Sequence, residues 1–195
     1  MKINFVKTFI PAKYFVAVEK VGNKIIVRFN AVKDTDIDAY SCIEGSVSAS
    51  EYDEQWVLRE YEAWKQKWAE KALTLAKKAK IAEITAYDTS PAVNGFILNG
   101  QRVWLDFELR DRVYQGNERL QRIGRTDTTL WLGKQCYNLS IEQAQNIISH
   151  IEAYAKDCYN VTAAHKKAVS ELATIEEVEK YDITAGYPAQ LKMEV

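Results

Sequence analysis

The sequence predicts an α+β fold in which antiparallel β-hairpins alternate with long helices. Short runs rich in Val, Ile, Phe and Tyr are separated by residue pairs typical of tight turns, which join antiparallel strands. The stretch 51–80 contains neither Gly nor Pro, and the stretch 140–173 repeats apolar residues at helical spacings of three and four. We therefore expect a β module and a long linking helix, followed by a hairpin-helix-hairpin-helix domain.

Composition limits the class of protein. The chain has 195 residues, and its 26 Lys and Arg nearly balance 27 Asp and Glu, which disfavours a basic nucleic-acid binder. The three cysteines include no Cys-x-x-Cys pair, so we expect free thiols. Charged and proline residues interrupt the N-terminal apolar stretch, and no apolar run is long enough for a membrane span, so we predict neither a signal peptide nor a membrane protein.

Residues 1–50 read as the β module. Strands are expected at 13–20 and 24–30, joined by a tight turn at Gly22-Asn23, with a third strand at 40–47. Between the second and third of these strands, aspartates occupy every other position, as the ligands of a calcium loop do: Asp34, Asp36 and Asp38. The positions that such a loop needs for its glycine and its closing carboxylate hold alanine and glycine, so we expect a solvated acidic turn and no metal.

The linking helix is expected at 51–82. Its acidic residues lie at the start and its lysines at the end, which complements the helix dipole. Tyr61, Trp64 and Trp68 share one face and form a candidate interface. The simpler interpretation, which we favour, is that they cover the N-terminal sheet.

The C-terminal domain is expected at 83–195. Asn99-Gly100 predicts a tight hairpin, and Gly133-Lys134 predicts a second one. Between them, Asp106 can cap a helix at 107–123 that Gly124 would end. Ser140 and Gln143 then form a capping box for the longest helix, and Thr174 with Glu177 forms another for a short last helix.

The longest helix carries a heptad-like seam. Its apolar positions are Ile141, Ala144, Ile148, Ile151, Ala155, Cys158, Thr162, His165, Val169 and Leu172. We expect the first half to pack on its own domain and a bend or break near Asn160. The second half is expected to be more exposed and partner-facing, with Thr162, His165, Val169 and Leu172 as candidate interface residues. His165 is interpreted either as a register-setting polar layer in an oligomer or as an edge-of-core residue.

Catalytic signatures are weak in this sequence. On one helix, His150 and His165 would lie about 22 Å apart, and Cys158 would lie about 10 Å from His165, too far for a metal pair or a nucleophile and its base. Six arginines at 102–125 alternate with acidic residues, which favours local salt bridges over nucleic-acid binding. We predict no catalytic residue, no cofactor and no metal, and hence a protein that is not an enzyme.

Three blocks of the chain are familiar: YDTSPAVNGFILNGQRVWLD at 87–106, GRTDTTLWLGKQCYNLS at 124–140 and YNVTAAHKKAVSELATIEEVEKYDITAGYP at 159–188. Together they resemble a family of uncharacterised C-terminal domains in phage and prophage proteins of gut bacteria, some encoded near tail and tail-fibre genes. The resemblance spans about residues 83–192. The closing pattern of His165, Leu172, Tyr181-Asp182 and Gly186-Tyr187-Pro188 resembles a broader set of phage tail-region proteins. The resemblance implies no catalytic residue.

These observations predict a non-enzymatic phage structural protein, located in the virion near the tail and assembled in the host cytoplasm. It would act through contacts with other phage structural proteins and with further copies of itself, without a membrane or nucleic acid. One alternative is a tail-fibre assembly chaperone that is absent from the mature particle. The other is a carbohydrate-binding or host-recognition module with Trp104, Trp131 or Tyr187 as its aromatic platform.

Overall fold

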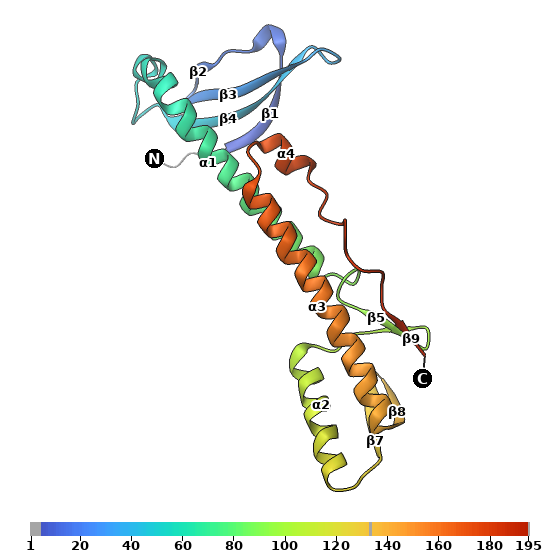
Figure 1. Ribbon diagram of the computed structural model, residues 1–195. Helices are drawn as coiled ribbons and strands as arrows, with labels where there is room; N and C mark the ends of the chain where they lie inside the picture. The colour runs from blue at the N-terminus through green and yellow to red at the C-terminus, as the bar shows by residue number, and fades with distance from the viewer. Residues whose placement is uncertain (1–4, 133, 195) are drawn as a thin grey trace. The chain divides into compact units, whose positions relative to one another are not determined.

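The computed structural model describes residues 5–132 and 134–194, and its helices and largely antiparallel strands confirm the α+β class (Figure 1). The chain divides into two compact units. Unit 1 comprises Met1–Lys78 with Ala173–Glu179, and unit 2 comprises Ala79–Leu172 with Lys180–Val195. Each unit therefore takes residues from two separate stretches of the chain.

Unit 1 contains a four-stranded antiparallel sheet in the order β1-β4-β3-β2. Its strands are β1 (Phe5–Pro11), β2 (Val18–Val21), β3 (Lys24–Asp34) and β4 (Ala39–Ser48). The predicted turn joins β2 to β3, and Gly22 has the positive φ of 58° that this turn requires. The sequence missed β1, which pairs at the edge with β4, and it missed the short 3-10 helix η1 (Ala12–Tyr14) that follows.

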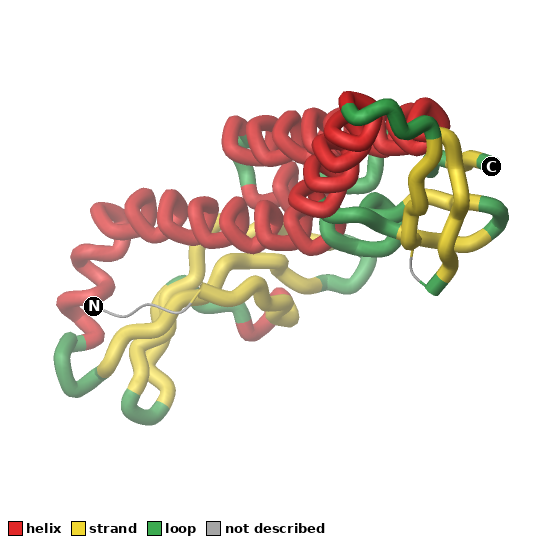
Figure 2. Tube along the Cα trace, turned by 90° about the horizontal axis from the view of Figure 1, so that it is seen from below, coloured by secondary structure: helices red, strands yellow, loops and turns green. Residues whose placement is uncertain are grey.

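Helix α1 (Glu54–Asp88) supplies the layer that covers this sheet (Figure 2). Val57, Trp68 and Ala72 of α1 are buried against strand residues such as Val27 and Phe29. Burial of a tryptophan side chain of this kind contributes about 3 kcal/mol, because a large apolar surface leaves water. The core of unit 1 therefore lies between one face of the sheet and the first part of α1.

The structure divides the chain differently from the predicted arrangement of 1–50, 51–82 and 83–195. The stretch expected to be only a linking helix is part of the unit 1 core up to Lys78. Helix α4 (Ile175–Lys180) also contributes to unit 1, because Ile175 packs against that core and Glu179 forms an ion pair with Lys7. The capping box predicted for α4 is present, with the Glu177 amide donating to Thr174 Oγ1 over 3.2 Å.

Unit 2 is built from two hairpins, two whole helices, the last residues of α1 and the C-terminal segment. Its elements are β5 (Phe96–Leu98), β6 (Gln101–Val103), α2 (Phe107–Arg122), β7 (Asp127–Leu132), β8 (Gln135–Ser140), α3 (Ile141–Glu171) and β9 (Lys192–Met193). Strand β9 pairs in parallel with β5, next to the β5–β6 hairpin. A second, two-stranded sheet is formed by β7 and β8.

Local signals place these elements well. Asn99 and Gly100 have positive φ values of 47° and 77° in the β5–β6 turn, and Asp106 caps α2 by accepting a hydrogen bond from the Leu109 amide. The Ser140 capping box opens α3 as predicted. The β7–β8 pairing agrees with the second predicted hairpin, although Gly133 of its turn lies outside the described residues.

The first half of the α3 seam packs inside unit 2. Ala144, Ile148 and Ile151 are buried in one cluster with residues of both hairpins, as predicted, and Ile141 at the start of the helix is buried as well. Of the predicted bend or break near Asn160, the break is absent, because α3 is one helix from Ile141 to Glu171. The polar residues of the second half do not interrupt the helix, since their side chains find partners elsewhere in unit 2.

Candidate functional site

The second half of the α3 seam is covered by the C-terminal segment. Thr162, His165 and Val169 retain only 3%, 8% and 0% of their exposure, and Leu172 is half-buried. The prediction of an exposed, partner-facing surface is therefore wrong for Thr162, His165 and Val169 in the single chain. The helical period identified the correct face of the helix, but it did not show that a later part of the same chain covers it.

His165 holds this segment at two points. Its Nε2 lies 2.8 Å from the carbonyl oxygen of Ala185, and its Nδ1 lies 2.8 Å from the hydroxyl of Tyr181. Because a carbonyl can only accept, Nε2 carries a proton, and in the neutral imidazole Nδ1 accepts from Tyr181. The ring also stacks on Tyr187 at a centroid distance of 5.7 Å and an interplanar angle of 29°.

Thr162 connects the same segment to the end of α1. Its hydroxyl donates to Asp88 Oδ1 over 2.7 Å, and Tyr187 Oη lies 2.7 Å from the same hydroxyl. The single hydroxyl proton of Thr162 goes to the carboxylate, so Tyr187 donates to Thr162. Burial raises the pKa of the Tyr187 phenol, which keeps the donating proton in place. Tyr87 adds an edge contact to the Tyr187 ring at 5.4 Å.

We call these five residues, Asp88, Thr162, His165, Tyr181 and Tyr187, the C-terminal clamp. All five lie in the blocks that carry the phage resemblance, and three of them, His165, Tyr181 and Tyr187, belong to its closing pattern. Each hydrogen bond of this kind contributes about 1 kcal/mol net. The structure thus gives these residues a structural role: they hold the C-terminal segment against α3.

Two further groups next to the clamp are held in their protonated forms. Tyr154 donates to the Val93 carbonyl over 3.1 Å, and burial, with a further effect of Cys158, raises its pKa to about 12. Burial also raises the pKa of the Cys158 thiol. Since the thiolate is the nucleophilic form of cysteine, this environment makes Cys158 inert.

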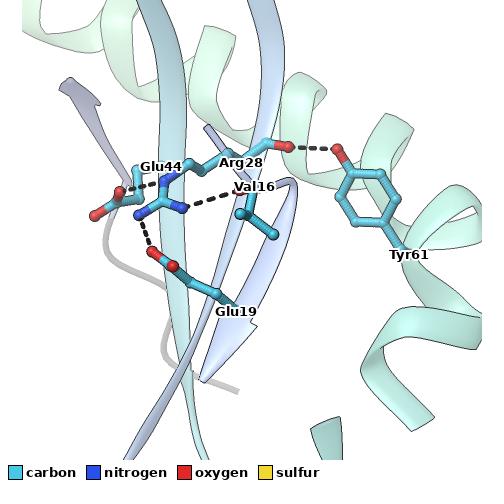
Figure 3. A network of polar contacts seen from close by, with 5 residues as sticks. All are labelled: Val16, Glu19, Arg28, Glu44 and Tyr61. Atoms are coloured by element: carbon cyan, nitrogen blue, oxygen red, sulfur yellow. Dashed lines mark hydrogen bonds and ion pairs between the residues drawn. The ribbon is translucent and has the colours of Figure 1, made fainter. Parts of the chain in front are cut away.

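Unit 1 contains a buried arginine that the sequence did not single out. Arg28 of β3 is 6% exposed, and its guanidinium donates to Glu44 over 2.9 Å, to the Val16 carbonyl over 2.9 Å and to Glu19 (Figure 3). Burial opposes the positive charge, but the hydrogen bonds to the two glutamates outweigh it, so the pKa of Arg28 is raised. The network ties β2, β3, β4 and the segment before β2 together.

The predicted aromatic interface on α1 packs against the sheet. The Tyr61 hydroxyl donates to the Arg28 carbonyl (Figure 3), and Trp68 lies 6.3 Å from Phe29 between ring centroids. Trp64 is half-buried and meets Trp68 edge-on at 5.1 Å. These contacts agree with the simpler interpretation, in which the three residues cover the N-terminal sheet.

The three aromatic residues considered as alternatives for a carbohydrate platform have different surroundings. Tyr187 belongs to the clamp, and Trp104 packs against the buried clusters of unit 2 with the Arg110 guanidinium 5.4 Å from its ring centre. Trp131 of β7 is 63% exposed, opposite Cys136 of β8. Arg110 itself is buried and pairs with Glu152 of α3 at 2.7 Å, a contact between distant parts of the sequence, whereas Arg125 forms the expected kind of local pair with Asp127 at 3.0 Å.

Large apolar side chains remain exposed at a few places. In unit 1 they include Phe9, Val32 and Ile37 at one end of the sheet, at 57%, 65% and 60%. In unit 2 they include Phe107 and Ile123 at the two ends of α2, at 65% and 75%. Exposed apolar side chains that lie together on a surface favour contacts with another macromolecule.

The aspartates of the loop between β3 and β4 are engaged locally. Asp38 pairs with Lys33 at 3.3 Å, and Asp34 accepts from the Asp36 amide over 3.0 Å. Within residues 5–132 and 134–194, no group of three or more His, Cys, Asp or Glu side chains is placed to hold a metal ion. Among the helices of these same residues, none combines the length and apolarity needed to cross a membrane.

Comparison with known proteins adds no relative. No family model, no curated protein and no solved structure matches this chain.

Proposed function

We propose that this chain is a non-enzymatic structural protein of a bacteriophage particle, located in the tail region and working through protein contacts. The proposal rests on the positions of the exposed apolar side chains. Phe9, Val32 and Ile37 lie at one end of the unit 1 sheet, and Phe107 and Ile123 flank α2. Such side chains on strands, loops and helix ends suit contact with another folded protein.

The buried polar groups support the same reading. The clamp residue His165 and the buried Arg28 each use their nitrogens to join separate segments of the chain. The raised pKa values of Cys158 and Tyr154 keep both groups protonated and therefore weakly nucleophilic. These groups stabilise the fold. The assignment to a phage tail rests on the resemblance of residues 83–192 to phage tail-region domains.

Peptide mapping of purified phage particles tests the proposal. Particles from the phage or prophage that encodes this chain are purified by density gradient and digested, and the peptides are compared with those from infected cells. We expect peptides from both units in the particles, at constant stoichiometry to a major tail protein. Peptides found in the infected cells but absent from the particles would refute the virion role and indicate an assembly chaperone.

A further inference from the structure

A bulge in β3 places two apolar side chains together at the end of the unit 1 sheet. Phe29 is opposite Ile43, but the register then shifts, and Val32 is opposite Ser41. Between these two pairs β3 has one residue more than β4, and Asn30 in this bulge has a φ of 52°. Phe9 of β1 is opposite the same Ser41 from the other side. Phe9 and Val32 therefore flank one β4 residue on one face, and both are more than half exposed.

This apolar pair adjoins an acidic loop. Residues 33–38 contain three aspartates and one lysine, a net charge of −2, together with the exposed Ile37. The charge of Lys13 on the neighbouring η1 lies over the ring of Tyr14, 4.7 Å from its centre. We call Phe9, Val32 and the loop 33–38 the sheet tip. The sheet tip combines apolar side chains with negative charge.

The end of α2 combines an apolar side chain with positive charge. Residues 119–127 contain Arg119, Arg122 and Arg125 against a single acidic residue, Asp127, which gives a net charge of +2. Ile123 ends the helix as its C-cap and is 75% exposed. We call residues 119–127 the α2 end. The three arginines are exposed, as is the turn that follows them.

We propose that the sheet tip of one copy of this chain binds the α2 end of a second copy. The sheet tip is negatively charged, the α2 end is positively charged, and both expose apolar side chains. The two surfaces are therefore complementary in charge and in apolar character. Arginine suits this contact because its planar guanidinium forms paired hydrogen bonds with carboxylates. The contact deepens the proposed structural function, on which it rests for its biological setting.

The two surfaces differ, so the contact is head-to-tail. A bound pair keeps one unused sheet tip on one copy and one unused α2 end on the other, so the assembly grows into a closed ring or an open filament. Pairing of β1 edges between copies is disfavoured by Lys7 and Pro11, which are residues that protect edge strands from such pairing. Self-association therefore uses the face and loop of the sheet tip.

Sedimentation velocity of the purified full-length chain tests this proposal. At low ionic strength we expect the mass to rise with protein concentration, and at about 1 M salt, where the Debye length is about 3 Å, we expect dissociation. The variants Asp36→Lys and Arg122→Glu each remove the net charge of one surface, and each should weaken association at least about tenfold. Glu62→Lys and Lys167→Glu change exposed charges elsewhere and serve as matched controls that associate like the wild type.

Mixing the two variants distinguishes head-to-tail contact from any symmetric one. The Asp36→Lys chain keeps an intact α2 end, and the Arg122→Glu chain keeps an intact sheet tip, so an equimolar mixture should form dimers and stop there. A mixture that stays monomeric overturns the proposal. So does a wild-type chain that is monomeric throughout at low ionic strength, a result that would assign the sheet tip to a different, basic partner. Either failure leaves the particle mapping unaffected, so the two proposals are tested separately.

Discussion

The C-terminal clamp makes a quantitative prediction for His165→Ala. The substitution removes two hydrogen bonds of 2.8 Å, to Tyr181 and to the Ala185 carbonyl, each contributing about 1 kcal/mol. It also removes the ring stacked on Tyr187, a contact contributing about 1 kcal/mol more. We therefore expect the C-terminal segment to be held about 3 kcal/mol less tightly in the variant.

Hydrogen exchange of two amides reports this loss directly. The Ile97 amide donates to the Leu191 carbonyl over 2.8 Å, and the Asn99 amide donates to the Met193 carbonyl over 3.0 Å. Both amides are protected only while the C-terminal segment lies beside β5. A loss of about 3 kcal/mol corresponds to roughly 100-fold faster exchange, because each 1.4 kcal/mol is about a factor of ten.

A matched change on the same helix provides the control. Lys167 is exposed, and its ammonium lies 3.9 Å from Glu171, so Lys167→Ala should leave the exchange of both amides unchanged. The reasoning is refuted if His165→Ala also leaves Ile97 and Asn99 as protected as in the wild type. That result would mean that the clamp contacts do not hold the segment.

Two further predictions concern charges. Arg28→Met leaves the Glu19 and Glu44 carboxylates without their shared partner, and we expect a loss of about 2 kcal/mol in urea denaturation. Glu19→Gln changes the more exposed carboxylate and should cost less than about 1 kcal/mol; equal losses would contradict the buried network. Hydrogen bonds from Thr184 hold the pKa of Asp182 below its usual 3.8, so their stabilisation is complete above that pH and is lost as the pH falls through the lower folded value. The protection of the Thr184 amide, relative to its intrinsic exchange rate at each pH, should then fall in acid, and Asp182→Asn should abolish this pH step.

Turns and caps could be predicted from the sequence because their signals are local. Gly22, Asn99 and Gly100 adopt the positive φ values that their turns need, and Asp106 and Ser140 cap the helices expected of them. In each case the residues that determine the geometry lie within a few positions of one another. The charge distribution of 51–80 and the apolar spacing of 140–173 likewise located the two long helices, although α1 continues to Asp88, past its predicted end at residue 82.

Pairings between distant segments could not be predicted. Strand β1 contains Lys7 and Pro11 and pairs with β4, more than thirty residues later, and β9 contributes only a two-residue pairing to β5. The heptad spacing identified the buried face of α3, but nothing local stated that Tyr181 and Tyr187 would cover it. Arg28 lies between buried residues of β3 and points to the other face of the strand. Nothing in the local sequence indicates that this other face of the sheet is covered as well.

The interleaving of the two units in the chain has a consequence for synthesis on the ribosome. The first stretch of unit 1 ends at Lys78, and the unit is completed only by Ala173–Glu179, where Val178 is buried, so the 94 residues 79–172 are translated in between. At about 5–20 residues per second this interval lasts roughly 5–20 s. During that time the nascent unit 1 lacks α4, and α3 emerges before the tyrosines that cover it. Chaperones that act on nascent chains therefore meet both incomplete surfaces at once.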